Sequence, residues 1–180
     1  MRRFIILAAF VCLAAGDDEI PGWKISTGQW SYDAKKEEIK GEGTANAESK
    51  TFPLGDFDMD FRFCIDDYSD PHNMAGISFR VAGESRYKLS FRCPNLVTFD
   101  KTITVAAGPK ILASQSMTIP KGKWIPVQLT ARRGNLQAKI GGKITLKAAD
   151  PDPLPPGVLA LSVFNTTARF IVKQIKVKDK

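Results

Sequence analysis

DFDMDFRFCIDDYSDPHNMAGISFRVAGESRYKLSFR, residues 56–92, is the stretch that decides the fold. Within it, residues 56–63, 75–80 and 87–92 alternate apolar and polar side chains with a period of two. Because successive side chains of a β-strand point to opposite faces, each segment is predicted to be a strand with an apolar and a charged face. The apolar faces need a shared core. The charged faces, rich in Arg and Asp, therefore form the surface where function is sought first.

The remaining sequence follows the same pattern and predicts an all-β domain. No window after residue 16 keeps apolar residues at helical spacing for three turns, and turn-forming runs such as 141–142 and 150–157 separate the short β-type segments. About a dozen strands cannot form one flat sheet, so we expect a two-sheet antiparallel β-sandwich. The predicted strands are residues 30–32, 38–41, 49–52, 57–65, 76–81, 87–92, 97–100, 111–116, 124–132, 136–140, 143–146, 158–164 and 170–177.

The N-terminus, residues 1–16, has the pattern of a secretory signal peptide. Arg2 and Arg3 precede an apolar run over residues 4–15, and small residues follow at 14–16. The run is too short for a comfortable membrane span, although an uncleaved anchor is the alternative interpretation. Cleavage leaves residues 17–180 as one domain, secreted or periplasmic, with no membrane span.

The charge of the chain does not favour nucleic acid as a partner. The formal net charge is +7, and loss of the two arginines in the predicted signal lowers it to +5. The remaining positive charge is scattered, apart from evenly spaced lysines in residues 173–180 that suit the solvent face of a last strand. Scattered charge and export both argue against nucleic acid binding.

The order of several motifs resembles a known family. They are GWKISTGQWSYDAKKEEIKGEG (22–43), TFPLGDFDMDFRF (51–63), NMAGISFR (73–80), GKWIPVQLTARRGNLQAKIGGK (122–143) and PPGVLALSVFNTTARFIVKQIKVKD (155–179). This arrangement is similar to the bacterial 3-keto-disaccharide hydrolase-like domains, which share the concanavalin A-like lectin/glucanase jelly roll. Laminin G-like domains share the architecture. The resemblance implies a concanavalin A-like jelly roll that contacts carbohydrate.

Asp58 and Asp60 are the catalytic candidates, because they resemble the carboxylate strand of laminarinase-type glucanases on this fold. Such enzymes need two carboxylates about 5 Å apart, and alternate residues of a strand are roughly 6 to 7 Å apart. The chain carries Asp where the family motif has Glu. The alternative is that these acids form ion pairs with neighbouring basic side chains.

The ligand-binding candidates lie on the same predicted charged face. Arg side chains bind sugar hydroxyls or carboxylates with fixed geometry, and an Arg–Asp salt-bridge lattice is the alternative. Aromatic faces stack on sugar rings, for which Trp23 and Tyr68 are the exposed candidates and Trp124 is expected to be structural. The ligand-binding residues are predicted to be Arg62, Arg80, Lys88, Arg92, Asn73 and Tyr68.

The loop at residues 65–73 and two cysteines offer further chemistry. Asp66, Asp67 and Asp70 supply the oxygen ligands that calcium prefers, although Asp-Pro is also an ordinary turn signal. Cys64 and Cys93 can form a disulfide in an oxidising compartment, and they can equally remain free. No cofactor other than calcium is indicated.

These observations predict an exported domain that binds a carbohydrate or glycan through a charged sheet face. Short loops around the predicted face favour binding over catalysis. Two alternatives remain: a glycoside hydrolase acting on 3-keto-disaccharides or related sugars, which the resemblance implies, and a laminin G-like domain that binds protein.

Overall fold

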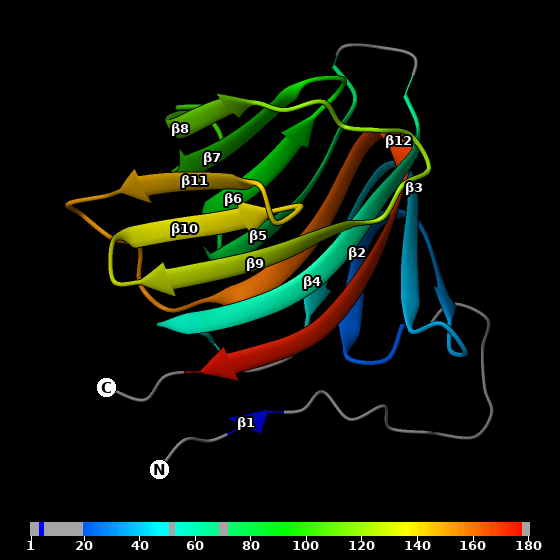
Figure 1. The fold of residues 1–180 in the computed structure, drawn as a ribbon. Coiled ribbons are helices and arrows are strands. Elements are labelled where there is room, and N and C mark those ends of the chain that lie inside the picture. The colour runs from blue at the N-terminus through cyan, green and yellow to red at the C-terminus, as the bar shows by residue number, and fades with distance from the viewer. Residues whose placement is uncertain (1–3, 6–19, 51–52, 69–71, 178–180) are drawn as a thin grey trace.

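The computed structural model describes residues 4–5, 20–50, 53–68 and 72–177. Every helix or strand assigned in these ranges is a β-strand, and all the pairings between strands are antiparallel (Figure 1). The strands are β1 (Phe4–Ile5), β2 (Trp23–Asp33), β3 (Glu38–Ser49), β4 (Phe57–Asp67), β5 (Met74–Ala82), β6 (Ser85–Arg92), β7 (Leu96–Thr102), β8 (Lys110–Ser116), β9 (Ile125–Arg132), β10 (Asn135–Ile140), β11 (Ile144–Ala149) and β12 (Val158–Val177).

β12 is shared by two layers of strands. It pairs with β3 along residues 160–170, with β5 along 158–164 and with β4 along 167–177. From β5 the sheet continues through β6, β7 and β8, which we call the β5 layer; from β4 it continues through β9, β10 and β11, the β4 layer. The two layers fold over each other, and β11 lies against β7 and β8 at the open side (Figure 1).

The bend between the layers lies at one level of three neighbouring strands. The pairing of β12 shifts register between Val163 and Thr166, and Asn165 there has a positive φ of 52°. Gly43 on β3 and Gly28 on β2, at the same level, have positive φ values of 71° and 78°. Left-handed residues at a β-bulge kink a strand and increase its twist, so β2, β3 and β12 turn together.

The core lies between the inward faces of the two layers. Phe57 of β4 meets Phe79 of β5 edge to face, with ring centroids 5.7 Å apart, and Phe63 of β4 stacks on Phe91 of β6 at 3.7 Å. All four rings are buried. Burial of each such side chain contributes roughly 1.5 to 3 kcal/mol, so these contacts hold the layers face to face.

The predicted all-β antiparallel fold is confirmed, with two corrections. The segments 158–164 and 170–177, predicted as separate strands, are one strand, β12, and it joins the two sheets into one continuous ladder. β4 and β5 do not pair with each other; they pair with successive parts of β12, residues 167–177 and 158–164, on either side of its bend. The charged faces of β4 and β5 therefore belong to different layers, because a long bent strand can pair with both.

The predicted signal peptide falls mostly outside the described residues. Of its 16 positions, only Phe4 and Ile5 are described, and they pair with Lys176 and Ile175 of β12. The predicted cleavage stays a prediction; a cleaved chain would lack this short pairing. Within the described ranges there is no helix of the length and apolarity needed to cross a bilayer.

Replacing Gly28 by Ala tests the shared bend. The new Cβ would overlap the Cβ of Ala45 and lie 2.6 Å from the Thr44 carbonyl oxygen, at a positive φ. We expect a loss of about 2 to 4 kcal/mol in the free energy of unfolding, measured by urea denaturation. Gly22→Ala is the control, because its φ is also positive but nothing lies within 4 Å, and it should cost only about 1 kcal/mol. Equal losses would contradict the crowding at this level.

Candidate functional site

A polar groove of about 380 Å³ lies on the outer face of the β5 layer, opposite the core. Side chains of β3, β12, β5, β6 and β7 line it. Residues 26–27 of β2 border it as well, together with Val105, Gly108 and Pro109 from the loop after β7. We call it the β6 groove, and its polar and charged residues include Asn46, Glu48, Ser78, Arg86, Lys88, Ser90, Arg92, Asp100, Thr102 and Ser162.

Strand register explains why these side chains gather. Lys88 on β6 lies directly across from Ser78 on β5 and from Asp100 on β7. Ser90 likewise lies across from Thr98 on β7. Each of these residues alternates along its strand with a buried apolar one, so they share the face turned away from the core.

Asp100 is the centre of the hydrogen-bond network in the β6 groove. Its Oδ2 accepts hydrogen bonds from the hydroxyls of Ser90 at 2.7 Å and Thr98 at 3.0 Å, and from Nη2 of Arg92 at 3.1 Å. The residue is only 3% exposed. These donors hold the carboxylate in one orientation, so the network fixes the position of Asp100 in the groove floor.

The side chain of Lys88 enters the groove and has no acidic partner there among the described residues. Its Nζ contacts the Met74 sulfur at 3.9 Å. Among the described residues, no carboxylate lies within ion-pair distance of it. Gly76 on β5 leaves room for the stem, since a Cβ there would lie 2.9 Å from Cε of Lys88. The side chain is thus accommodated by packing but not neutralised.

The pKa of the Lys88 amine is lowered from its ordinary value to about 8. Burial is the main cause, because the ammonium loses water; the like charges of Arg86 and Arg92 add to it, and the Asp100 carboxylate opposes it. At pH 7 roughly a tenth of the molecules therefore carry a neutral amine at Lys88.

Two buried polar atoms in the β6 groove have no hydrogen-bond partner. They are Oδ1 of Asp100 and Oγ of Ser162, and in the described residues only Oδ1 of Asn73 shares this property. Buried polar atoms are nearly always hydrogen-bonded, and an exception calls for a specific reason. Two such atoms in one groove are suited to the hydroxyl groups of a ligand.

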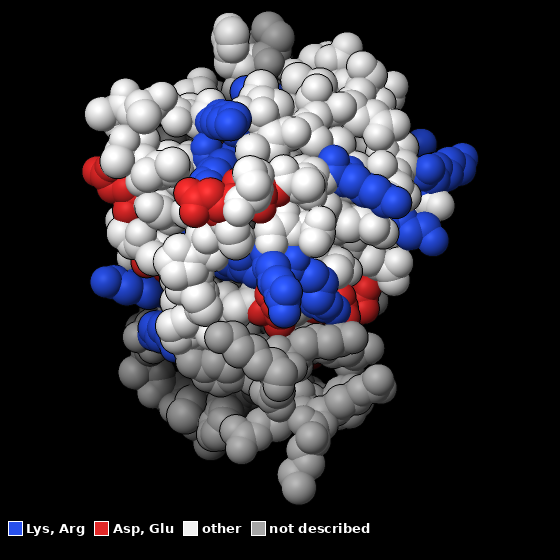
Figure 2. Space-filling view, turned by 90° about the vertical axis from the view of Figure 1, so that its left-hand side faces the viewer, with Lys and Arg blue, Asp and Glu red and all other residues white. Residues whose placement is uncertain are grey.

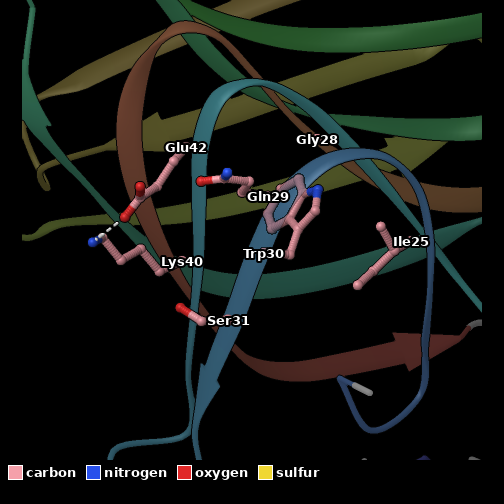
Figure 3. Close-up of a pocket in the computed structure, with 7 residues that line it drawn as sticks. All are labelled: Ile25, Gly28, Gln29, Trp30, Ser31, Lys40 and Glu42. Atoms are coloured by element: carbon pink, nitrogen blue, oxygen red, sulfur yellow. Dashed lines mark ion pairs between the residues drawn. The ribbon is translucent and has the colours of Figure 1, made fainter. Parts of the chain in front are cut away.

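A larger cavity of about 690 Å³ lies at β2 and β3 but offers less chemistry (Figure 3). The ring of Trp30 is buried, and its Nε1 donates to the Thr27 carbonyl, so its faces are not presented for stacking. Lys40 and Glu42 form an ion pair with each other, as Figure 3 shows. With its charges already paired, this cavity is the weaker candidate despite its size.

Asp58 and Asp60 lie on the outer face of the β4 layer, away from the β6 groove. Asp58 pairs with Arg132 at 2.5 Å and accepts a hydrogen bond from Thr130. Asp60 borders a shallow depression between β4 and β9. The prediction that these acids share one face with the basic residues of β5 and β6 is wrong, because β4 and β5 pair with different halves of the bent strand β12 and lie in different layers.

Arg62 also belongs to the β4 layer. Its guanidinium lies 5.6 Å from the ring centroid of Trp124, and that of Arg169 lies 5.2 Å from the same ring. Of the basic ligand candidates, Lys88 and Arg92 are the two that line the β6 groove. The basic candidates predicted to share one charged face therefore do not all lie together.

Arg80 is structural rather than surface-facing. A positive φ of 52° at a break in register interrupts the alternation of β5, and the side chain is 3% exposed. It donates hydrogen bonds to the carbonyls of Gly55, Arg133 and Leu154 and pairs with Asp56 at 3.0 Å. These bonds tie three loops to the edge of the sandwich.

The predicted stacking and amide contacts lie away from the β6 groove. Trp23 is 4% exposed, so the prediction of an exposed ring is wrong. The Tyr68 hydroxyl donates to the Ile119 carbonyl at 2.9 Å, and Nζ of Lys121 lies 4.7 Å from its ring centroid. Tyr68 and Asn73 line a separate polar cavity of about 520 Å³.

The carboxylates proposed for calcium are engaged by cations. Asp66 forms a bidentate ion pair with Arg169, and Asp67 forms an ion pair with Lys121 at 2.8 Å. Asp70 lies outside the described residues. Among the residues that are described, no three His, Cys, Asp or Glu side chains are grouped as a metal site, so this loop gives no support for calcium.

Cys64 and Cys93 are both buried free thiols, so of the two possibilities that the sequence left open, this structure has the unpaired one. Burial raises the pKa of each thiol to about 11, with smaller opposing effects from Arg169 and Lys121 respectively. A thiol with a raised pKa is a weak nucleophile. Neither is suited to covalent catalysis.

Sequence reasoning missed the centre of the groove, Asp100, together with Thr98 and Ser162. The signal existed: residues 97–100 alternate as Val-Thr-Phe-Asp, and residues 159–163 alternate in the same way. What was lacking was the strand order, which brings β12 and β7 to either side of β5 and β6.

Charges on another side of the molecule are dispersed. On the side drawn in Figure 2, Lys and Arg side chains lie in separate groups with acidic residues close to several of them. There is no continuous basic band on that side. The expectation that nucleic acid is not a partner rests on such scattered charge and remains a prediction.

The fold and the groove together define a concanavalin A-like β-sandwich with a polar sheet face. Residues 13–178 match the family model described as 3-keto-alpha-glucoside-1,2-lyase-like domain, so the chain belongs to that family. This confirms the resemblance inferred from the motifs. A comparison with curated proteins finds no match.

Solved structures support the same fold. The carbohydrate-binding module CBM66 from Bacillus subtilis aligns with a TM-score of 0.73 and 18% identity, over 86% of this chain and 95% of that one. A Bacillus subtilis protein of unknown function with a galectin-like fold aligns with a TM-score of 0.67 and 14% identity, over 87% of this chain and 90% of that one. The carbohydrate recognition domain of Emp47p aligns with a TM-score of 0.58 and 12% identity, over 89% of this chain and 90% of that one. At these identities the likeness establishes the fold.

Replacing Arg80 by Met tests its structural assignment. Loss of three carbonyl hydrogen bonds and of the pair with Asp56 should lower the free energy of unfolding by about 3 to 5 kcal/mol in urea denaturation. Arg133→Met is a matched control, because Arg133 has a similar φ of 48° but an exposed side chain. It should change stability by less than about 0.5 kcal/mol. A small effect at Arg80 would contradict this role.

Lys88→Met should stabilise the protein at pH 7. The lowered pKa means that the unfolded chain binds more protons than the folded one between about pH 8 and 10.5, so stability from this group rises with pH across that window. We expect a gain of about 1 to 3 kcal/mol at pH 7 that shrinks toward pH 10, measured by urea denaturation. Lys147→Met, on exposed β11, should be neutral. A destabilised Lys88→Met protein at pH 7 would show that the amine is compensated.

Proposed function

We propose that this protein is an exported domain that binds a saccharide in the β6 groove. The observation that carries the proposal is Asp100: its Oδ2 is saturated by three donors while its buried Oδ1 has none. A carboxylate held in this way is a fixed acceptor for a hydroxyl group. The N-terminal pattern of residues 1–16 supports export, where free glycans are met.

The other groove residues complement a sugar ring. The unpartnered Ser162 hydroxyl can both donate and accept, and Lys88 supplies donors to ring or hydroxyl oxygens. Met74, Val81 and Val105 add apolar surface within the same groove, which suits the C–H faces of a pyranose. A few fixed polar groups beside apolar surface are typical of small-molecule sites.

The spacing of carboxylates favours binding over glycoside hydrolysis. Asp100 and Glu48 both line the groove, but β6, β5 and β12 lie between their strands. Four strand spacings correspond to roughly 19 Å. Hydrolysis by a carboxylate pair needs a separation of about 5 to 10 Å, so the positions of these two strands do not favour a hydrolytic pair.

One observation favours elimination as a second candidate reaction. The family description names a 1,2-lyase of 3-keto-alpha-glucosides. In such a sugar the C3 carbonyl acidifies the proton on C2. A base takes that proton as the C1–O bond breaks and the C1–C2 double bond forms, and the protonated base then gives the same proton to the leaving-group oxygen. Lys88, with its pKa near 8, is the groove residue able to serve as that base.

Groove-filling substitutions test the binding site. Ser162→Leu places a bulky side chain in the β6 groove without removing a hydrogen bond, because its hydroxyl makes none. We expect it to lower affinity for any saccharide bound by the wild type by at least about tenfold, measured by calorimetry after a glycan array has identified a ligand. Ser31→Leu makes the matched change in the β2–β3 cavity and should leave binding intact.

The array also contains a 3-keto-glucoside, and its cleavage is measured by the amount of product released. Cleavage that is lost in Lys88→Met would favour the lyase candidate. Binding blocked by Ser31→Leu but not by Ser162→Leu would move the site to the other cavity, and no binding to any glycan would overturn the proposed function.

A further inference from the structure

The charges of the β6 groove are unbalanced. Arg86, Lys88 and Arg92 all project from β6 into the groove, whereas Asp100 is the single carboxylate on the adjoining strands β5 and β7 that lines it. Glu48 lies across the groove on β3, three strands away from β6. The side of the groove along β6 therefore carries an excess of positive charge.

The pairing within the groove leaves two of these cations without an anion. Arg92 pairs with Asp100 at 3.1 Å. For Arg86 and Lys88, no carboxylate lies within 4.0 Å among the residues that the structure describes. They are alternate residues of one strand, about 7 Å apart along it, so their long side chains can reach a single group.

An enclosed cation without a partner costs free energy that the fold does not recover by itself. Removing an ammonium from water is expensive unless an opposite charge or good hydrogen bonds replace the water. A neutral sugar supplies only dipoles to Lys88, whereas an anionic group supplies a charge. The same ligand must also carry a hydroxyl, because Oδ1 of Asp100 is an acceptor that lacks a donor.

We propose that the ligand of the β6 groove is an acidic saccharide, whose carboxylate or sulfate lies between Lys88 and Arg86 while a neighbouring hydroxyl donates to Asp100. This inference rests on the proposed saccharide site and specifies its substrate class. Both requirements, an anion and a hydroxyl close together, are met by uronic acids and by sulfated sugars.

Calorimetry with matched sugars tests the proposal. The probes are trigalacturonate, its fully methyl-esterified form, which keeps the rings but removes the charge, and a sulfated galactose oligosaccharide. Trigalacturonate or the sulfated sugar should bind at least about tenfold more tightly than the methyl ester, and this advantage should shrink as salt is raised. Tight binding of only one acidic probe would identify the anionic group of the ligand as a carboxylate or as a sulfate. Tight binding of both would show that the site recognises negative charge rather than one particular group.

Variants separate charge from folding. Lys88→Gln and Arg86→Gln should each remove most of the preference for the acidic probe, while Lys147→Gln on exposed β11 should retain it. Equal binding of the methyl ester and the acidic probes would overturn the acidic ligand but leave the saccharide site standing. Binding of neutral glycans alone would likewise overturn the acidic ligand and leave the saccharide site standing. If neither neutral nor acidic glycans bind, both the acidic ligand and the saccharide site are overturned.

Discussion

The structure depends on the hydrogen bonding of one long strand, β12. It pairs with β3 over residues 160–170, while β5 and β4 take successive parts of its remaining pairing capacity. A straight strand could not serve two layers that fold over each other. The bulge around Asn165, matched by left-handed glycines on β3 and β2, lets the ladder turn without leaving backbone groups unpaired in the core.

This bend also decides which surfaces exist. On one side of it, β5, β6 and β7 present an outer face that is hollowed and lined with enclosed polar groups. On the other side, the outer face of the β4 layer carries acids such as Asp58 that are paired with cations. The first face keeps unsatisfied polar atoms and an unpaired lysine, whereas Asp58 on the second face is paired with Arg132. Buried polar and charged groups without partners lower the stability of the fold, and such groups are typical of sites selected for binding.

Much of the fold could be read from the sequence because its determinants are local. The alternation of residues 57–63 and 87–92 correctly separates buried from surface-facing side chains, and Lys88 and Arg92 were placed on the right face. Arg80 was misplaced because a left-handed residue breaks the alternation, and an Arg side chain gives no sign of that conformation in advance. Trp23 was misplaced because an aromatic residue near a strand end suits either a core or a surface.

The sequence by itself determined that this chain is all-β, which residues face the core and to which family it belongs, since period-two alternation and motif order are properties of the chain alone. Only the tertiary structure decided which charged strand faces lie side by side. Strand order depends on pairings between residues far apart in the chain, and here the last strand bends and pairs with β5 in one layer and with β4 in the other. This bend removed Asp58 and Arg62 from the site and brought Asp100 and Ser162 into it.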